Sequence, residues 1–161
     1  MVENFKKIEN KEIYLKEVID RYVVNSETIK RKVDSMMYGY SFEDNNERFL
    51  VTLEKGKHLF NFYEHLDITI YDLKRGLDVS YLNAEFLIEG EIRIAGIDTM
   101  NAYWGRNYAT IITQLLINYA KNNKFSKIYG GIFLGGDTEA LKRFYKRNGF
   151  EVKSSYFSMN L

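Results

Sequence analysis

The sequence predicts a mixed α/β protein built on a partly parallel sheet with crossover helices. From Glu91 onward, strand and helix patterns alternate in the order β–α–β–α–β, which implies parallel strands joined by helices. Aromatic residues make up 16% of the chain, and such side chains favour half-buried strands. We expect a single domain, residues 1–161, because this length fits one core.

The N-terminal half carries weaker patterns. The expected strands cover residues 3–8, 48–54, 59–63 and 67–72. The expected helices cover residues 11–24 and 26–37. The strands at 48–54 and 59–63 are expected to form a hairpin around a turn at 54–57. Residues 74–90 leave three alternatives open, namely a loop, an additional strand or a short helix.

The patterns sharpen in the C-terminal half. The expected strands cover residues 91–100, 127–134 and 151–161, and the expected helices cover residues 110–122 and 137–148. The apolar residues of the first helix share one face and are Ile111, Ile112, Leu115, Leu116 and Tyr119. In the second helix Asp137 is a good N-cap, Leu141 and Phe144 are expected to pack inward, and Gly149 suits the left-handed position after a helix end.

The composition excludes several classes of site. The chain has no cysteine, which excludes disulfides, thiolate zinc sites and cysteine nucleophiles. Its two histidines, His58 and His65, lack metal-ligand spacing, so we expect no metal. A net charge of +1 with interspersed signs argues against nucleic-acid binding. The charged N-terminus is not a secretory signal and the apolar runs are too short to span a membrane, so we expect a cytoplasmic protein.

The loop at residues 101–109 predicts an anion site. It joins an expected strand to an expected helix, whose first backbone N–H groups are unpaired and lie at the positive end of the helix dipole. Gly105 and Ala109 would let the backbone approach a pyrophosphate, and Asn107 tolerates a positive φ. Arg106 would add a charge-assisted contact. An ordinary loop before a helix is the open alternative.

The second informative segment spans residues 135–150. Tyr145 lies well inside its helix, where its hydroxyl would point toward the strand ends and protonate a departing thiolate. The alternative is a half-buried packing tyrosine, one of 13 in the chain.

Together the two segments resemble the GNAT (N-acetyltransferase) superfamily. The acyl-CoA loop of that family, Q/R-x-x-G-x-G/A, corresponds to residues 104–109, where Ala109 fits and where Trp104 and Asn107 differ. The later family signature, N-x-x-A-x-x-x-x-Y-x-x-x-G-F, corresponds to residues 137–150, in which only the first residue differs, Asp for Asn. The resemblance covers the C-terminal part of the chain.

The resemblance implies a mixed sheet that splays open where the pantetheine of coenzyme A inserts. It implies acetyl-CoA as acyl donor, no metal, and an amine acceptor that the sequence does not identify. Backbone groups at the end of the 91–100 strand would pair with the pantetheine, the loop amides would hold the pyrophosphate, Asp137 would lie near the pantetheine and Tyr145 near the sulfur. The cofactor-binding residues implied are Thr99, Met100, Asn101, Trp104, Gly105, Arg106, Asn107, Tyr108, Ala109, Thr110 and Asp137.

The reaction implied is direct attack of the amine on the thioester, with proximity and orientation as the main contribution of the protein. The amine must first lose a proton, and Glu91 and Asp98 are the candidate bases. Strand alternation predicts that they point to opposite faces, so at most one faces the acceptor. Glu85 and Glu89 are weaker candidates. Tyr145 is the candidate acid.

Two other functions stay open. The departures at Trp104 and Asn107 suit a GNAT-like binding module that lacks catalysis. A structural or partner-binding α/β protein, pairing through aromatic strands, is the other alternative, and a homodimer is not excluded. No Walker loop, G-x-S-x-G elbow or dinucleotide fingerprint is present, so nucleotide hydrolysis, serine esterase chemistry and hydride transfer lack support.

Overall fold

The computed structural model describes residues 6–10, 35–57, 63–87, 89–133 and 137–161. The helix expected at 11–24 lies outside these residues, as do most residues of the helix expected at 26–37 and of the strand expected at 59–63.

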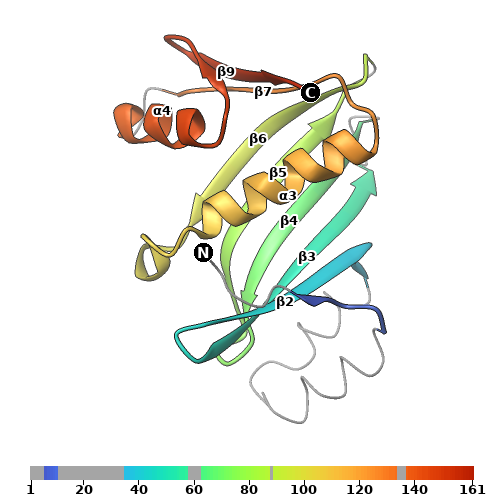
Figure 1. The fold of residues 1–161 in the computed structure, drawn as a ribbon, viewed down its shortest axis with the longest axis vertical. Coiled ribbons are helices and arrows are strands. Elements are labelled where there is room, and N and C mark those ends of the chain that lie inside the picture. Colours follow the sequence, from blue (N-terminus) through green and yellow to red (C-terminus); the bar gives the residue numbers. More distant parts are fainter. Residues whose placement is uncertain (1–5, 11–34, 58–62, 88, 134–136) are drawn as a thin grey trace.

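The described residues form one sheet of nine strands in the spatial order β1-β2-β3-β4-β5-β6-β7-β9-β8 (Figure 1). The strands are β1 (Lys6–Lys7), β2 (Tyr38–Asp44), β3 (Glu47–Lys57), β4 (Glu64–Asp72), β5 (Leu77–Phe86), β6 (Glu91–Thr99), β7 (Lys127–Gly131), β8 (Glu151–Val152) and β9 (Tyr156–Asn160). Neighbouring strands are antiparallel except β6 and β7, which are parallel. The prediction of a partly parallel, mixed sheet is therefore confirmed.

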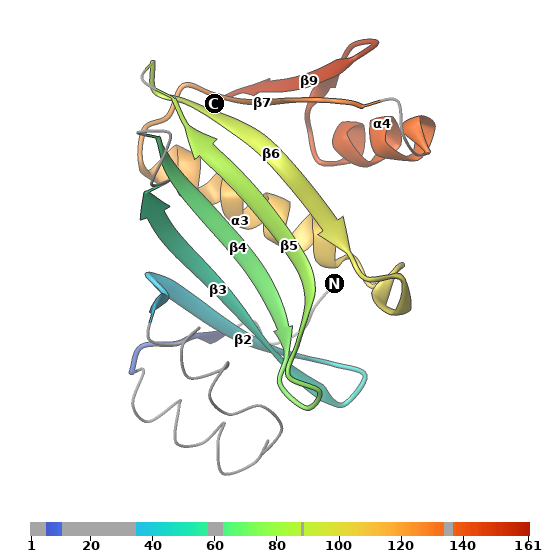
Figure 2. The same ribbon diagram turned by 180° about the vertical axis from the view of Figure 1, so that it is seen from behind.

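Three helical segments follow β6 and β7: the 3-10 turn η1 (Asn101–Tyr103), α3 (Tyr108–Asn122) and α4 (Thr138–Arg147). Helix α3 crosses one face of the sheet and packs against β4, β5, β6 and β7, as the front and back views show (Figures 1 and 2). Helix α4 packs beside β8. Within the described ranges, none of the helices combines the length and the apolar character needed to cross a membrane.

The buried face of α3 is rotated from the predicted one. Ile112 and Leu116 are buried as expected, but Ile111 and Leu115 are only partly buried. The face closest to the sheet instead continues through the residues Tyr108, Thr113, Ile117 and Ala120. Apolar residues cover more than half of this helix, so periodicity alone does not locate the centre of its buried face.

The hairpin prediction was wrong in the position of its turn and of its second strand. The expected turn at 54–57 is strand, because β3 continues to Lys57 and its Gly56 pairs with His65. A Cβ on Gly56 would lie 2.6 Å from the His65 ring, so the ring fills the space of a side chain. Strands β3 and β4 are nevertheless antiparallel neighbours, and the chain joins them between Lys57 and Glu64, where residues 58–62 are not described. A separate tight turn at Asn45 and Asn46 joins β2 to β3, and both residues have positive φ (50° and 61°) as in a type I′ hairpin turn.

The additional-strand alternative for residues 74–90 is correct, because β5 occupies most of this range. The turn between β4 and β5 is fixed by Asp72, whose Oδ1 accepts hydrogen bonds from the amides of Lys74 (2.9 Å) and Arg75 (3.0 Å). This turn and the β2–β3 turn lie at the same end of the sheet (Figure 1).

A bulge in β6 changes which side chains share a face. The β5–β6 register skips Ala95, and a bulged residue reverses the alternation of the side chains that follow it. Glu91 and Asp98, which lie on either side of Ala95, therefore point to the same face of the sheet. The prediction that they point to opposite faces is wrong, because strict alternation holds only in a regular strand.

Candidate functional site

Strands β6 and β7 separate partway along their length. They pair only at Glu91, Ile92 and Arg93 of β6, although β6 continues to Thr99. Beyond Arg93 the two strands diverge, with β7 leading toward α4 (Figure 1). The edge of β6 at residues 94–99 faces this opening and pairs with no other described strand. Such an edge offers backbone groups to an extended ligand, and the splay expected from the resemblance is confirmed.

Gly130 lies where the strands part. A Cβ at this position would be 2.4 Å from the Phe157 ring and 3.1 Å from the carbonyl oxygen of Ile94. The ring of Tyr145 stacks on Phe157, with 3.5 Å between the ring centroids. A continuous series of contacts thus connects Tyr145 with the apex of the opening.

Tyr145 combines a packing role with an unused hydroxyl. The side chain is 4% exposed and also contacts Phe144 and Phe150 edge to face. Burial raises the pKa of its phenol above the ordinary value, and no described residue forms a hydrogen bond with the hydroxyl. The phenol is therefore protonated near neutral pH, as a proton donor must be.

The loop before α3 has the backbone form of an anion site. Gly105 (φ 80°) and Asn107 (φ 63°) both lie in the left-handed region. The Asn107 side chain makes no capping hydrogen bond, and the first turn of α3 has no acidic residue. The first amides of this helix are therefore free of side-chain acceptors, and the dipole favours an anion there. A Cβ on Gly105 would meet nothing within 4 Å, so the backbone is approachable.

Neither Trp104 nor Tyr108 fills the space beside the free amides of the loop. Trp104 is 67% exposed, and its Nε1 donates a hydrogen bond to the carbonyl oxygen of Thr99 at 2.6 Å. Tyr108 is 1% exposed and packs beneath the loop against Phe42 and Phe49. The Met100 amide donates to a carbonyl of β5 at 3.0 Å. The carbonyls of Met100 and Asn101 accept from the amides of Tyr103 (2.8 Å) and Trp104 (3.2 Å). Four of the backbone groups expected to pair with pantetheine thus have partners within the protein.

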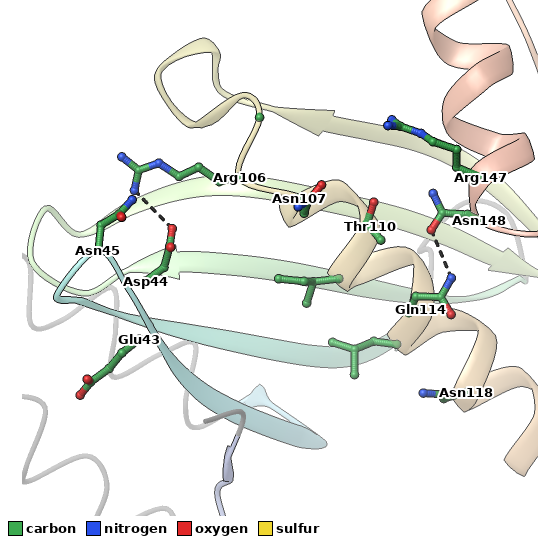
Figure 3. Close-up of a pocket in the computed structure, with 13 residues that line it drawn as sticks. Glu43, Asp44, Asn45, Arg106, Asn107, Thr110, Gln114, Asn118, Arg147 and Asn148 are labelled. Atoms are coloured by element: carbon green, nitrogen blue, oxygen red, sulfur yellow. Dashed lines mark hydrogen bonds and ion pairs between the residues drawn. The ribbon is translucent and has the colours of Figure 1, made fainter. Parts of the chain in front are cut away.

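Arg106 points toward the β2–β3 hairpin (Figure 3). Its Nη1 lies 3.5 Å from Oδ2 of Asp44 and 4.0 Å from Oε2 of Glu47, and its guanidinium lies 5.1 Å from the centre of the Tyr103 ring. Two carboxylates therefore compete with any bound phosphate for this cation.

A group of polar side chains lies beneath the loop, and sequence analysis missed most of it. The hydroxyl of Tyr108 donates to Asp44 at 2.7 Å, and that of Tyr103 donates to Asp72 at 2.6 Å. Burial raises the pKa of Asp72, but hydrogen bonds from Tyr103 and Arg75 outweigh this effect and the pKa lies below its ordinary value. Only the three-residue spacing of Asp72 and Arg75 was visible locally, because the other partners are distant in sequence.

A cleft of about 960 Å³ runs from this loop along the outer side of α3 (Figure 3). It begins at the β2–β3 hairpin and the free amides of the loop, and it continues past Thr110 and Gln114. Its far end is formed by Arg147, the last residue of α4, and by Asn148, the C-cap, and Gln114 Nε2 donates to Asn148 Oδ1 at 3.2 Å. The sequence analysis did not assign Arg147 to a site, although the cleft connects it with the loop.

The remaining predicted residues are dispersed. Asp137 is the N-cap of α4, as expected, and its Oδ1 accepts from the Ala140 amide at 2.9 Å. Glu91 lies at the paired end of β6, with its Oε1 3.8 Å from Nζ of Lys127. Asp98 lies at the open end and accepts from the Thr99 amide at 2.8 Å. Because a strand rises about 3.3 Å per residue, the two candidate bases are about 20 Å apart and neither lies at the apex.

The two weaker candidate bases are also distant from the loop. Glu85 pairs with Arg93 across β5 and β6, and Glu89 is exposed.

No protein-family model matches the chain, and no curated protein sequence matches it. Solved structures do. A GNAT-family acetyltransferase from Staphylococcus aureus Mu50 superimposes on 98% of this chain and 99% of its own, with a TM-score of 0.54 and 13% identity. Nourseothricin acetyltransferase matches 60% of this chain with a TM-score of 0.53 and 12% identity, and the match spans only 65% of that enzyme.

Arabidopsis thaliana Naa50, in complex with the bisubstrate analogue CoA-Ac-MVNAL, matches 59% of this chain and 72% of its own, with a TM-score of 0.51 and 14% identity. Identities this low carry information on the fold alone. The mixed sheet of nine strands with its helices agrees with these matches. This chain therefore has the fold of the GNAT acetyltransferases.

Proposed function

We propose that this protein is an acetyl-CoA-dependent N-acetyltransferase that transfers an acetyl group to an amine. One observation carries the proposal: the unpaired edge of β6 leads directly into the free amides at the start of α3. A ligand that fits both features has an extended chain, which pairs with the edge of β6, followed by a diphosphate, which binds the free amides of α3. The Naa50 structure, which has the same fold and a CoA-containing ligand, supports coenzyme A as that molecule.

Coenzyme A would lie across the site in three parts. Its pantetheine would follow the free edge of β6 toward the backbone of Thr99, Met100 and Asn101, with Asp137 on the opposite side of the opening. Its diphosphate would accept hydrogen bonds from amides between Gly105 and Thr110. The nucleotide would then enter the cleft beside α3, whose far end carries Arg147.

In the proposed reaction the amine nitrogen attacks the thioester carbonyl carbon, and the C–S bond breaks. Tyr145 protonates the departing thiolate, because its neutral hydroxyl has no other partner among the described residues. The Tyr145 ring stacks on Phe157, which packs against Gly130 at the apex of the opening. The acceptor ammonium first loses one proton through water to a carboxylate, which leaves a neutral amine to attack. After the attack the nitrogen loses a second proton through water, and this proton replaces the one that Tyr145 gave to the thiolate. Asp98 is the better placed of the two candidates, since it lies at the open end of β6, whereas Glu91 lies beside Lys127.

The composition of the chain provides two assays without engineering. Trp104 is the only tryptophan, so intrinsic fluorescence reports directly on the proposed site during a titration with CoA. The chain has no cysteine, so a thiol reagent detects only the CoA released from acetyl-CoA. We expect saturable fluorescence change with CoA and amine-dependent thiol release with some members of a panel of polyamines, amino acids and short peptides. Absence of both signals would overturn the proposal.

A binding module without catalysis is the second candidate. The hydrogen bond from Trp104 to the Thr99 carbonyl favours it, because that carbonyl is one that pantetheine would use. The same two assays separate the candidates. Saturable CoA binding without thiol release across the amine panel, from pH 7 to pH 9, would support the module and not the enzyme.

A further inference from the structure

The loop between β6 and α3 is attached to the sheet by two tyrosines, one near each end. Tyr103 is 5% exposed and donates its hydroxyl proton to Asp72 at 2.6 Å. Tyr108 is 1% exposed and donates its hydroxyl proton to Asp44 at 2.7 Å. The two rings lie 6.1 Å apart beneath the loop. Both ends of the loop are thus held from below by hydrogen bonds to carboxylates, one buried at Tyr103 and one part-buried at Tyr108.

The two carboxylates are themselves fixed. Asp72 is fully buried and accepts from two amides of its own turn. Arg75 contacts Asp72 and also lies 2.9 Å from Glu47 at the start of β3. Asp44 ends β2 and lies 3.5 Å from Arg106. The acceptors therefore belong to two hairpins of the sheet, and these hairpins are joined by a bridge of opposite charges.

Between its two anchors the loop is held by side-chain contacts of Trp104 with the Thr99 carbonyl and of Arg106 with Asp44 and Glu47, and its backbone hydrogen bonds are long. The Arg106 amide makes a long hydrogen bond of 3.4 Å to the Tyr103 carbonyl. Asn107 holds a left-handed conformation, which costs a residue other than glycine about 1 kcal/mol. No side chain caps α3. The direction of the first free amides therefore depends on how Tyr103 and Tyr108 hold the two ends.

We propose that Tyr103 and Tyr108 are positioning residues that hold the loop amides in the orientation needed to bind the diphosphate of coenzyme A. This inference rests on the proposed function. The bonds act through the backbone, because both hydroxyls lie beneath the loop and neither is directed into the cleft beside α3. Their loss is expected to weaken binding and to leave the chemical step unchanged.

The test compares Tyr103→Phe and Tyr108→Phe with a matched control. Tyr119→Phe makes the same change on α3, where no described residue forms a hydrogen bond with the hydroxyl and where the side chain packs on Phe86 and Phe125. Calorimetric titration with CoA measures affinity, and urea unfolding measures stability. Hydrogen exchange of the amides at 104–110, without CoA, measures the order of the loop.

We expect Kd for CoA to rise about tenfold in each anchor variant, as for the loss of one hydrogen bond to a charged group, and to stay within about twofold in Tyr119→Phe. The double variant should weaken binding by less than the product of the two single effects, because both bonds hold one loop. Exchange at 104–110 should become faster in the anchor variants, while exchange in β3 and β4 stays at the wild-type rate. The value of kcat at saturating acetyl-CoA should not change.

Two failures can be told apart. Unchanged CoA affinity in both anchor variants, with only a lower free energy of unfolding, would show a purely structural role and overturn this inference alone. A wild-type protein that does not bind CoA would overturn the proposed function, and the positioning role with it.

Discussion

The indole N–H of Trp104 donates a hydrogen bond to the carbonyl oxygen of Thr99 at 2.6 Å, across the end of β6. Thr99 is the last residue of the strand whose edge faces the opening between β6 and β7. Trp104 is 67% exposed, so the indole occupies the Thr99 carbonyl oxygen without filling the space beside the loop amides. A pantetheine amide that uses this carbonyl must first displace the indole.

Replacement of Trp104 by Phe should therefore strengthen the binding of pantetheine-containing ligands. The competing donor is lost while an aromatic ring stays, and one net hydrogen bond of about 1 kcal/mol corresponds to roughly fivefold in Kd. Calorimetric titration should show this gain for CoA and no gain for adenosine 3′,5′-bisphosphate, which lacks the pantetheine arm. An equal change for both ligands would contradict displacement of the indole.

Arg147→Gln should distinguish CoA from dephospho-CoA. Arg147 lies at the far end of the cleft that begins at the loop amides, so its guanidinium is placed for the 3′-phosphate of the nucleotide. We expect Kd for CoA to rise about three- to tenfold at low salt, as for an exposed ion pair, and Kd for dephospho-CoA to stay constant. Arg143→Gln is the control, because Arg143 is an exposed cation of the same helix outside the lining of the cleft. Similar losses for both nucleotides would argue against this contact.

Tyr145→Phe should slow turnover roughly a hundredfold and leave the affinity for CoA nearly unchanged, because it removes one general acid and keeps the packed ring. Burial raises the pKa of the Tyr145 phenol above its ordinary value, so the wild-type acid stays protonated up to at least about pH 10. The pH–rate profile should accordingly show no decline from this group between pH 7 and pH 9. Thiol release measures both effects, and wild-type turnover in the variant would remove Tyr145 from the mechanism.

Asp72→Asn should destabilise the fold in a pH-dependent way. Asp72 has a lowered pKa in the folded protein, so its charge stabilises the fold above the unfolded-state pKa of about 4 and this contribution is lost as pH falls through the folded-state value. We expect a loss of about 1–3 kcal/mol at pH 7, because the buried Asp72 carboxylate loses charge-assisted hydrogen bonds from Tyr103 and from the half-exposed Arg75, and a smaller difference from wild type at pH 3. Urea unfolding at both pH values measures it. A difference that is constant with pH would show that Asp72 acts through shape and not through charge.

Gly130→Ala should disturb the apex of the opening. The added Cβ would lie 2.4 Å from the Phe157 ring and 3.1 Å from the Ile94 carbonyl, so Phe157 must move and Tyr145 with it. We expect a loss of about 1–3 kcal/mol of stability from overpacking, measured by urea unfolding. Gly96→Ala is the matched control, because a Cβ there meets nothing within 4 Å. Equal losses in the two variants would place the cause in the backbone instead of in the contact with Phe157.

The C-terminal elements follow from local patterns. Asp137 caps α4 through an amide three residues away, and Gly149 (φ 89°) ends it in the left-handed region. These contacts lie within a few residues of each other, so residue type and spacing are enough to predict them. The β2–β3 turn has a local signal as well, in Asn45 and Asn46, whereas Gly56 lies within β3, where it makes room for the His65 ring and not for a turn.

The sequence by itself determined the order of strands and helices from β6 onward, except that the one strand expected at 151–161 is divided into β8 and β9. It also determined the caps of α4 and the resemblance of two segments to the GNAT family, because all of these depend on neighbours along the chain. Only the tertiary structure decided the bulge at Ala95 and the attachment of the loop to the sheet. Tyr108 is 64 residues from Asp44 in the sequence. Tyr103 is 31 residues from Asp72. Hydrogen bonds over such separations form only after the sheet has brought its hairpins together, so no local pattern encodes them.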